Sequence, residues 1–168
     1  GRLDALARDL LEAAGGGAPL RREPTSPAAL VRDRIAFYRE QAATAAVALE
    51  QAGDDPGPMA LDRGRLERAL DNLILNALAH LPEGGVIELG ARRRGPAHWL
   101  LWVADDGVGV PPELRESLFE PFATARSGGS GLGLALVREI VQAHGGRVAL
   151  AESARGARIE MELPWPAS

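Results

Sequence analysis

A glycine-dense loop that runs directly into an apolar helix constrains this chain more than any other feature. Residues 127–134 are Ser-Gly-Gly-Ser-Gly-Leu-Gly-Leu, and an apolar pattern with helical spacing continues to His144, Gly145 and Gly146. Glycines let backbone N–H groups approach an anion closely, and the first turn of the following helix adds the positive end of its dipole. The pattern predicts a phosphate cradle, although a glycine-rich surface loop that binds nothing has the same composition.

The composition limits the other possibilities. The chain has 168 residues, of which 46% are hydrophobic and 25% charged, and this balance predicts one soluble globular domain. The net charge of -4 argues against a general nucleic-acid binder, which normally carries a basic surface patch. The chain has no cysteine, so disulfides, thiolate zinc sites and cysteine nucleophiles are excluded.

Leucines with helical spacing predict a first helix over residues 3–11, which the glycines at 15–17 end. These leucines are Leu3, Leu6, Leu10 and Leu11. They have no partner within so short a segment. We therefore expect the tail of a longer helix whose apolar stripe packs elsewhere.

The remaining elements alternate between helices and antiparallel strand pairs. Ser26 and Asp62 each precede a helical pattern and are typical helix caps, while Gly95 and Pro96 mark a hairpin turn. The expected elements are a linker at 20–27, a helix at 27–46, strands at 47–49 and 59–61, a helix from 63 to about 80, strands at 86–90 and 99–103, a helix after the glycine-rich loop, and strands at 147–151 and 158–163. This order predicts a two-layer α/β sandwich.

Two asparagines share one face of the helix that begins at residue 63. Asn72 and Asn76 are four residues apart, and asparagine is a poor residue for a helix interior. Such amides fit a buried hydrogen-bonded network. They also fit a Mg²⁺ site, because Mg²⁺ takes few protein oxygens and completes its shell with waters and substrate phosphates.

Three further features lie between these asparagines and the glycine-rich loop. Asp105 ends a strand and is followed by Gly107 and Gly109, a spacing that suits a nucleobase pocket or an ordinary loop cap. The pair Phe119 and Phe122 fits either a packing anchor for a mobile loop or a plain core role. Arg126 can neutralise a terminal phosphate or keep an exposed loop solvated.

In order along the chain, these segments resemble the signature segments of sensor histidine kinases. They are Asn-x-x-x-Asn-Ala at 72–77, Asp-x-Gly-x-Gly at 105–109, Phe-Glu-Pro-Phe at 119–122 and Gly-x-Gly-Leu-Gly-Leu at 129–134. Residues 47–163 resemble the catalytic and ATP-binding domain of these kinases, whose superfamily includes type II topoisomerases, Hsp90 chaperones and mismatch-repair ATPases. The resemblance implies the Bergerat ATP-binding fold, an α/β sandwich with a mixed sheet covered on one face by three helices.

The resemblance also implies roles for particular residues, with ATP and Mg²⁺ as cofactors. Asn76 would hold Mg²⁺ with support from Asn72, Asp105 would bind the adenine amine, and Arg126 or His80 would face the terminal phosphate. The resemblance also implies a mobile lid over the bound ATP. The other implied contacts are Gly107 and Gly109 at the base, Phe119 and Phe122 beside this lid, and Gly129, Ser130, Gly131, Leu132 and Gly133 at the phosphates. Hydrolases of the superfamily carry a glutamate where this chain has Asn72. Because asparagine cannot take a proton, the resemblance favours phosphoryl transfer over hydrolysis.

The chain departs from the family pattern at two places. Many members carry a lysine or arginine three residues after the magnesium asparagine, and this chain has Ala79. None of His80, His98 and His144 has the acidic neighbour and helical setting of a phosphoacceptor histidine, so we expect structural or solvent-facing roles for them, with His80 bordering the site. We therefore interpret the chain as part of a longer kinase.

This interpretation sets the expected domains and partners. Residues 1–19 would be the end of the dimerisation and phosphoacceptor hairpin helix, residues 20–46 the linker and first helix of the catalytic domain, and residues 47–168 its remainder. The expected partners are ATP, the protein's own dimerisation and histidine-phosphotransfer domain, and the receiver domain of a response regulator. The resemblance implies a cytoplasmic domain that is monomeric alone, in a homodimeric parent protein anchored in the cell membrane.

The expected function is transfer of the ATP γ-phosphoryl group to a histidine, for relay to a response regulator. Two other functions stay open. A serine kinase of the anti-sigma type shares the ATP-binding fold without a histidine hairpin, but the N-terminal leucines and the Phe-Glu-Pro-Phe segment favour the histidine kinase. The second is a degenerate nucleotide-binding module that regulates a partner, which Ala79 keeps open.

Overall fold

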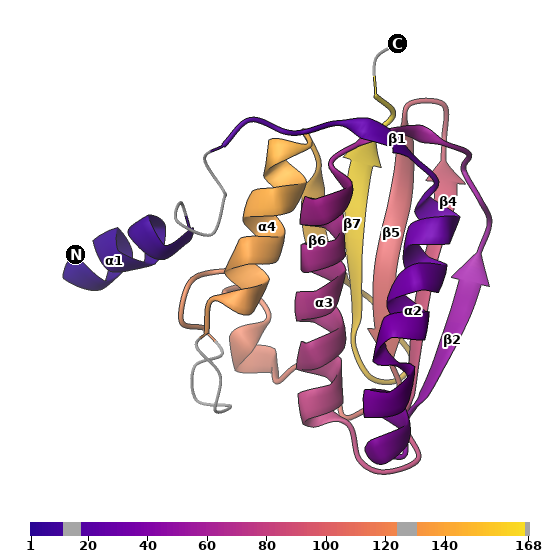
Figure 1. The fold of residues 1–168 in the computed structure, drawn as a ribbon. Helices are drawn as coiled ribbons and strands as arrows, with labels where there is room; N and C mark the ends of the chain where they lie inside the picture. Colours follow the sequence, from indigo (N-terminus) through magenta and orange to yellow (C-terminus); the bar gives the residue numbers. More distant parts are fainter. Residues whose placement is uncertain (12–17, 124–130, 167–168) are drawn as a thin grey trace.

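A five-stranded sheet forms one layer of the structure, a computed structural model that describes residues 1–11, 18–123 and 131–166. Its strand order is β2 (Ala48–Gly53), β4 (Val86–Arg94), β5 (His98–Asp105), β7 (Arg158–Pro164) and β6 (Arg147–Ala151). The β2–β4 pair is parallel and the other neighbours are antiparallel, so the sheet is mixed. The helices α2 (Pro27–Thr44), α3 (Arg63–His80) and α4 (Gly133–Ala143) cover one face (Figure 1). The predicted two-layer α/β sandwich is confirmed.

The central helix α3 begins and ends where the sequence predicts. The side chain of Asp62 accepts a hydrogen bond from the Arg65 backbone N–H, which caps the first turn. One face of α3 is buried against the sheet and the flanking helices, through Leu66, Ala69, Leu70, Leu73, Ile74 and Ala77. Asn72 and Asn76 lie outside this buried stripe and stay partly accessible. The packing of α3 therefore fixes where the two amides are presented.

The β4–β5 hairpin brings Asp105 to the end of the sheet near the C-terminus of α3. Asp105 is opposite Ile87, close to the start of β4, and the Ala48 backbone N–H donates to the Gly85 carbonyl in the loop that follows α3. A β-carbon on Gly107 would lie 3.0 Å from the Leu81 side chain, directly after α3. The C-terminus of α3 and the loop after β5 are thus neighbours.

The short strand β1 lies within residues 20–27, for which the sequence pattern predicts only a linker. Residues Glu23–Thr25 pair antiparallel with β3, Met59–Leu61. A three-residue strand that contains a proline has no readable period-two pattern, and it is stabilised by contacts to residues some 35 positions later. The strand at 47–49 also extends further, to Gly53, because parallel pairing with β4 supports its polar residues.

The buried histidine His144 joins the two helices that carry the predicted site. Its Nδ1 lies 2.9 Å from the Ile140 carbonyl, and its Nε2 accepts a hydrogen bond from the Asp62 backbone N–H at 3.2 Å. A neutral ring with its proton on Nδ1 satisfies both contacts. Burial lowers the pKa of His144 and so favours this neutral form. The predicted structural role of this histidine agrees with its position.

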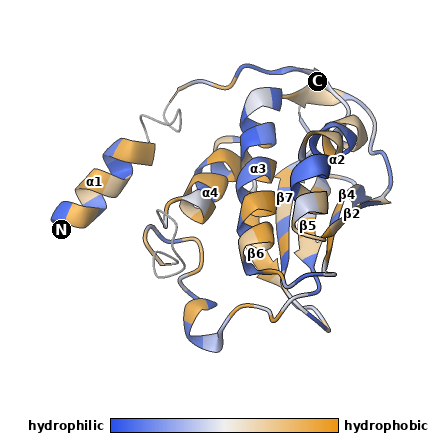
Figure 2. Cartoon of the chain, turned by 60° about the horizontal axis from the view of Figure 1, so that its bottom comes forward, coloured by the Kyte–Doolittle hydropathy of each residue, from blue (hydrophilic) through white to orange (hydrophobic). Residues whose placement is uncertain are grey.

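The N-terminal helix α1 (Arg2–Leu11) contacts α4 and has a second, exposed apolar stripe. Ala7 and Leu11 are buried, whereas Leu3, Leu6 and Leu10 are 68%, 51% and 45% exposed. Figure 2 shows that hydrophilic and hydrophobic residues alternate along α1. The leucine pattern that predicted the helix therefore lies mostly on its solvent side.

Candidate functional site

A cavity of about 200 Å³ opens between the C-terminal half of α3 and the loop that follows β5. Asn76, Ala77 and His80 of α3 form one wall, and Asp105 lies at the end of β5. The opposite wall comes from Gly109, Val110, Pro111, Leu114, Leu118 and Ala157. A smaller recess continues inward to Leu73, Val103 and Ile159 of the core. The cavity is mostly apolar with a few polar groups, which is typical of a site for a flat organic ring.

Among the described residues, the carboxylate of Asp105 is held through one of its two oxygens. Its Oδ1 accepts hydrogen bonds from the backbone N–H of Gly107 at 2.9 Å and of Ala157 at 3.4 Å. The Asp105 backbone N–H donates to the Ala157 carbonyl at 2.8 Å. Asp105 is therefore a loop cap through Oδ1, while Oδ2 has no hydrogen-bond partner among the described residues. Both interpretations of this residue fit, because the second oxygen stays available to a ligand.

The two glycines after Asp105 have different surroundings. Gly109 lines the cavity with φ of +80°, and a β-carbon there would lie 3.1 Å from the Gly156 carbonyl oxygen. Gly107 lies behind the cavity, where its N–H binds Asp105 and its Cα faces Leu81. The loop can follow this path closely because neither residue carries a side chain.

Asn72 and Asn76 do not form a buried amide network. The Nδ2 of Asn72 donates to the Arg68 carbonyl of its own helix at 3.0 Å, and its Oδ1 would lie 3.4 Å from a β-carbon on Gly133. Asn76 lines the cavity, and its side chain has no hydrogen-bond partner among the described residues. The structure thus brings Asn76 to the cavity and Asn72 to the first residue of α4.

The cavity wall is poor in positive charge. His80 is exposed at the C-terminus of α3, with Nδ1 2.7 Å from the Asn76 carbonyl oxygen, and the neighbouring Ala79 is exposed as well. Among the residues that the structure describes, no lysine or arginine lines this cavity. The described part of the chain also contains no group of three or more His, Cys, Asp or Glu side chains that could hold a metal ion. The described wall offers the Asn76 amide oxygen and the Asp105 carboxylate as oxygen donors.

Only the end of the glycine-rich loop lies within the described residues. Gly131 has φ of +76°, and its carbonyl accepts a hydrogen bond from the Phe122 N–H at 2.8 Å. The Leu132 carbonyl accepts from the Leu136 N–H, and α4 begins at Gly133. The predicted site residues Arg126, Gly129 and Ser130 lie outside the described residues. The first residue of α4 lies beside Asn72.

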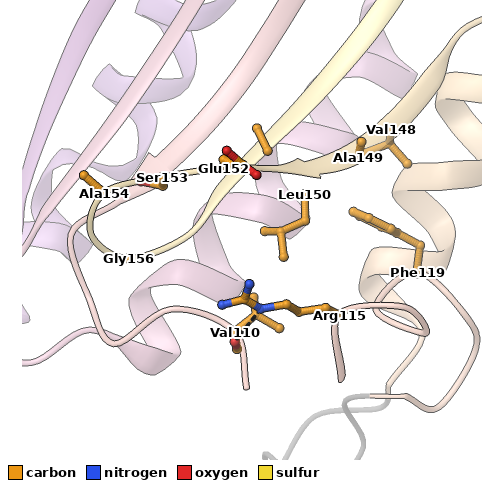
Figure 3. Close-up of a pocket in the computed structure, with 11 residues that line it drawn as sticks. Val110, Arg115, Phe119, Val148, Ala149, Leu150, Glu152, Ser153, Ala154 and Gly156 are labelled. Atoms are coloured by element: carbon orange, nitrogen blue, oxygen red, sulfur yellow. Dashed lines mark hydrogen bonds between the residues drawn. The ribbon is translucent and has the colours of Figure 1, made fainter. Parts of the chain in front are cut away.

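Phe119 lies at a different cavity from Asp105. It packs partly buried against the core and lines a larger space, about 790 Å³, between β6 and residues 110–119 (Figure 3). Phe122 is partly buried and has a positive φ of +67°, which is unusual for a side chain of this size. These positions fit packing anchors at the base of the loop, and neither phenylalanine lines the Asp105 cavity.

Sequence reasoning missed the residues that reach the cavity from the far end of the chain. Ala157 lines the cavity and bonds Asp105, and Gly156 packs behind it. In the sequence, Gly156 looks like any turn glycine between two strands. Its proximity to Asp105 depends on the β5–β7 pairing, which joins residues more than 50 positions apart.

Comparison with known proteins places this chain in a known family. Residues 61–167 match the family described as histidine kinase-, DNA gyrase B-, and HSP90-like ATPase. The alginate biosynthesis sensor protein KinB of Pseudomonas aeruginosa is 46% identical over 117 residues, which cover 68% of this chain and 20% of KinB. Sensor histidine kinase WalK of Bacillus subtilis is 36% identical over 113 residues, or 62% of this chain and 18% of WalK.

A solved structure has the same fold over nearly the whole chain. Full-length ShkA in complex with AMPPNP superposes with a TM-score of 0.83 at 30% identity, covering 98% of this chain and 35% of ShkA. The chain therefore belongs to the histidine kinase-, DNA gyrase B- and HSP90-like ATPase family. Within it, the chain is a catalytic ATP-binding domain of the sensor histidine kinases of two-component signalling.

The chain spans about a fifth of the length of KinB and WalK. Among the described residues, no helix is both long and apolar enough to cross a bilayer.

Proposed function

We propose that the Asp105 cavity binds the adenine of Mg²⁺-ATP and that the domain donates the γ-phosphoryl group to a histidine on a separate dimerisation domain. The phosphoryl group would then pass to an aspartate in the receiver domain of a response regulator. The observation that carries the proposal is the one-sided fixation of Asp105. Asp105 lines a mostly apolar cavity, and its Oδ2, which has no hydrogen-bond partner among the described residues, can accept a hydrogen bond from the exocyclic amine of adenine.

The two asparagines fit a magnesium role. Asn76 lines the cavity, and its amide has no hydrogen-bond partner within the described part of the chain. Asn72 keeps its Oδ1 toward the start of α4. Bound Mg²⁺ neutralises phosphate charge and holds the β- and γ-phosphates in one geometry. Asn76 would supply a direct oxygen ligand, with Asn72 one turn earlier supporting the same site. Neither residue can deprotonate water, so the site favours transfer over hydrolysis.

The phosphates would lie along the start of α4. Backbone N–H groups at a helix N-terminus are free to bind anions, and glycines let the phosphates approach them. We assign this contact to Gly129, Ser130, Gly131, Leu132 and Gly133. Arg126 or His80 would face the terminal phosphate, because this chain has Ala79 where many family members carry a lysine or arginine. Gly107 and Gly109 would shape the base pocket, with Phe119 and Phe122 anchoring the lid.

The exposed leucines of α1 support a partner helix at the N-terminus. Leu3, Leu6 and Leu10 are spaced by three and four residues, the spacing of a helix–helix seam. We propose that residues 1–19 are the end of the dimerisation hairpin helix, residues 20–46 the linker and first helix of the catalytic domain, and residues 47–168 its remainder. The parent protein would be a homodimer.

One observation favours a second function. The described wall of the cavity has no lysine or arginine, and Ala79 is exposed where many relatives carry a cation. A domain that binds nucleotide weakly and acts only on a partner would have this charge pattern.

A phosphotransfer assay separates the two functions. The chain is mixed with labelled ATP, Mg²⁺ and a phosphoacceptor hairpin of a sensor histidine kinase, with that kinase's own catalytic domain as positive control. We expect a label on the hairpin that is stable to base and lost in acid, and none with Asn76→Ala. An acid-stable label would instead indicate a hydroxyl acceptor and a serine kinase. Nucleotide binding without any transfer would favour the regulatory module.

A further inference from the structure

The turn between β6 and β7 packs against the back of the Asp105 loop. Ala157 exchanges two hydrogen bonds with Asp105, one from the Asp105 N–H to the Ala157 carbonyl and one from the Ala157 N–H to Oδ1. Gly156 precedes it, and Figure 3 shows this glycine in the loop between the two strands, above Val110. At this turn Ala157 lines the Asp105 cavity, and its neighbour Gly156 lines the larger cavity. Two consecutive residues of the turn thus border the two cavities.

Gly156 could not carry a side chain without moving Asp105. A β-carbon at this position would lie 1.9 Å from the Asp105 carbonyl oxygen and 2.8 Å from the Gly107 nitrogen. Both atoms are backbone, so no side-chain rotation can relieve the collision. The displaced backbone would include the Gly107 N–H that holds Oδ1. The absence of a β-carbon at Gly156 therefore permits the backbone path on which the carboxylate of Asp105 is held.

We propose that Gly156 is a positioning residue for base recognition. Its close backbone contact, together with the two Ala157 hydrogen bonds, orients Asp105 so that Oδ2 meets a 6-amino purine and rejects a 6-oxo purine. The proposal rests on the proposed function, because it requires ATP to bind at Asp105. It adds that the choice of base depends on a turn more than 45 residues away from the Asp105 loop in the sequence.

The chain contains a matched control for the substitution Gly156→Ala. Gly95, in the β4–β5 turn, has φ of +66°, close to the +72° of Gly156, but a β-carbon there would have no atom within 4 Å apart from those of its own residue and its two chain neighbours. Gly95→Ala therefore introduces the same left-handed backbone strain without the collision. A difference between the two variants isolates the contact with Asp105.

The test compares the dissociation constants of Mg²⁺-ATP and Mg²⁺-ITP, which has an oxygen in place of the 6-amino group. We expect the wild type and Gly95→Ala to prefer ATP by about tenfold or more, the range for a charge-assisted hydrogen bond. Gly156→Ala should lose most of this preference. A merely structural role would weaken both nucleotides equally and leave their ratio unchanged, which would overturn the proposal.

Two further outcomes keep the proposal and the proposed function separate. A wild type that binds neither nucleotide refutes the proposed function, whereas a wild type that binds both equally refutes base recognition by Asp105. If Gly156→Ala does not fold, the wild-type amide NMR signals of Gly107 and Ala157 provide the test. We expect saturating ATP to shift both signals and saturating ITP to shift them much less. Equal shifts with the two nucleotides would contradict the positioning role.

Discussion

Replacing Asp105 by asparagine should change which purine the domain prefers without unfolding it. Oδ1 of Asp105 accepts hydrogen bonds from the Gly107 and Ala157 N–H groups. An asparagine can keep its carbonyl oxygen on these two donors, which places its NH₂ group where Oδ2 was. The asparagine NH₂ group and the adenine amine would then face each other as two donors, which cannot hydrogen-bond to each other. A 6-oxo purine would find a donor at the same place.

The magnitude follows from the hydrogen bonds involved. Loss of a hydrogen bond to a charged group costs about 1.5–3 kcal/mol, or roughly ten- to a hundredfold in the dissociation constant of ATP. Asp105→Ala should lose the same affinity. It should also lower the free energy of unfolding by a further amount of about 1–3 kcal/mol, because two partly buried N–H groups lose their acceptor. Asp105→Asn should keep most of that stability.

Isothermal titration calorimetry with ATP and ITP, together with thermal unfolding of each variant, measures both effects. We expect Asp105→Asn to bind ATP more weakly than the wild type and to shift the preference toward ITP. The Gly95→Ala variant controls for nonspecific loss of stability. Unchanged ATP affinity in both Asp105→Asn and Asp105→Ala would refute the assignment of the base pocket.

The other predictions concern the metal, the missing cation and pH. Asn76→Ala should weaken Mg²⁺-ATP more than metal-free ADP, and equal losses in titrations of the two ligands would argue against a magnesium role. Ala79→Lys should tighten ATP several-fold at low salt with the effect shrinking as salt rises; no change would show that this position does not face the phosphates. Because burial depresses the pKa of His144 below the ordinary 6.5, its contribution to stability is present above pH 6.5 and is lost as the pH falls toward the lower folded-state pKa. Urea unfolding of the wild type and His144→Gln between about pH 7.5 and 5 should therefore show a steeper acid loss in the wild type, and parallel curves would contradict this.

The sequence alone was enough for those parts of the fold whose signals are local. The cap at Asp62, the apolar stripe of α3 and the hairpin turn at Gly95 depend on residues within a few positions of one another, and each was predicted where the structure has it. Strand β1 could not be predicted, because its three residues are held by β3 rather than by their own pattern. The same holds for the full length of β2, which depends on its parallel partner.

The candidate site likewise contains residues that local sequence patterns identify and residues that they do not. Asn76 and Asp105 belong to motifs that predict a nucleotide site, and the structure places both on one cavity. Ala157 carries no functional group and reaches Asp105 only through strand pairing, so no pattern could identify it. Phe119 was expected beside the lid, and the structure shows it lining the neighbouring cavity between β6 and residues 110–119. Its side-chain direction depends on the path of residues 110–119, which spacing does not determine.

Calorimetric titration of the whole chain with a non-hydrolysable ATP analogue, with and without Mg²⁺, tests the central claim most directly. The account predicts binding in the micromolar to submillimolar range that Mg²⁺ strengthens. It also predicts that Asp105→Ala abolishes most of this binding and that Asn76→Ala removes the effect of Mg²⁺. Absence of detectable binding under both conditions would contradict the claim that the Asp105 cavity is a nucleotide site.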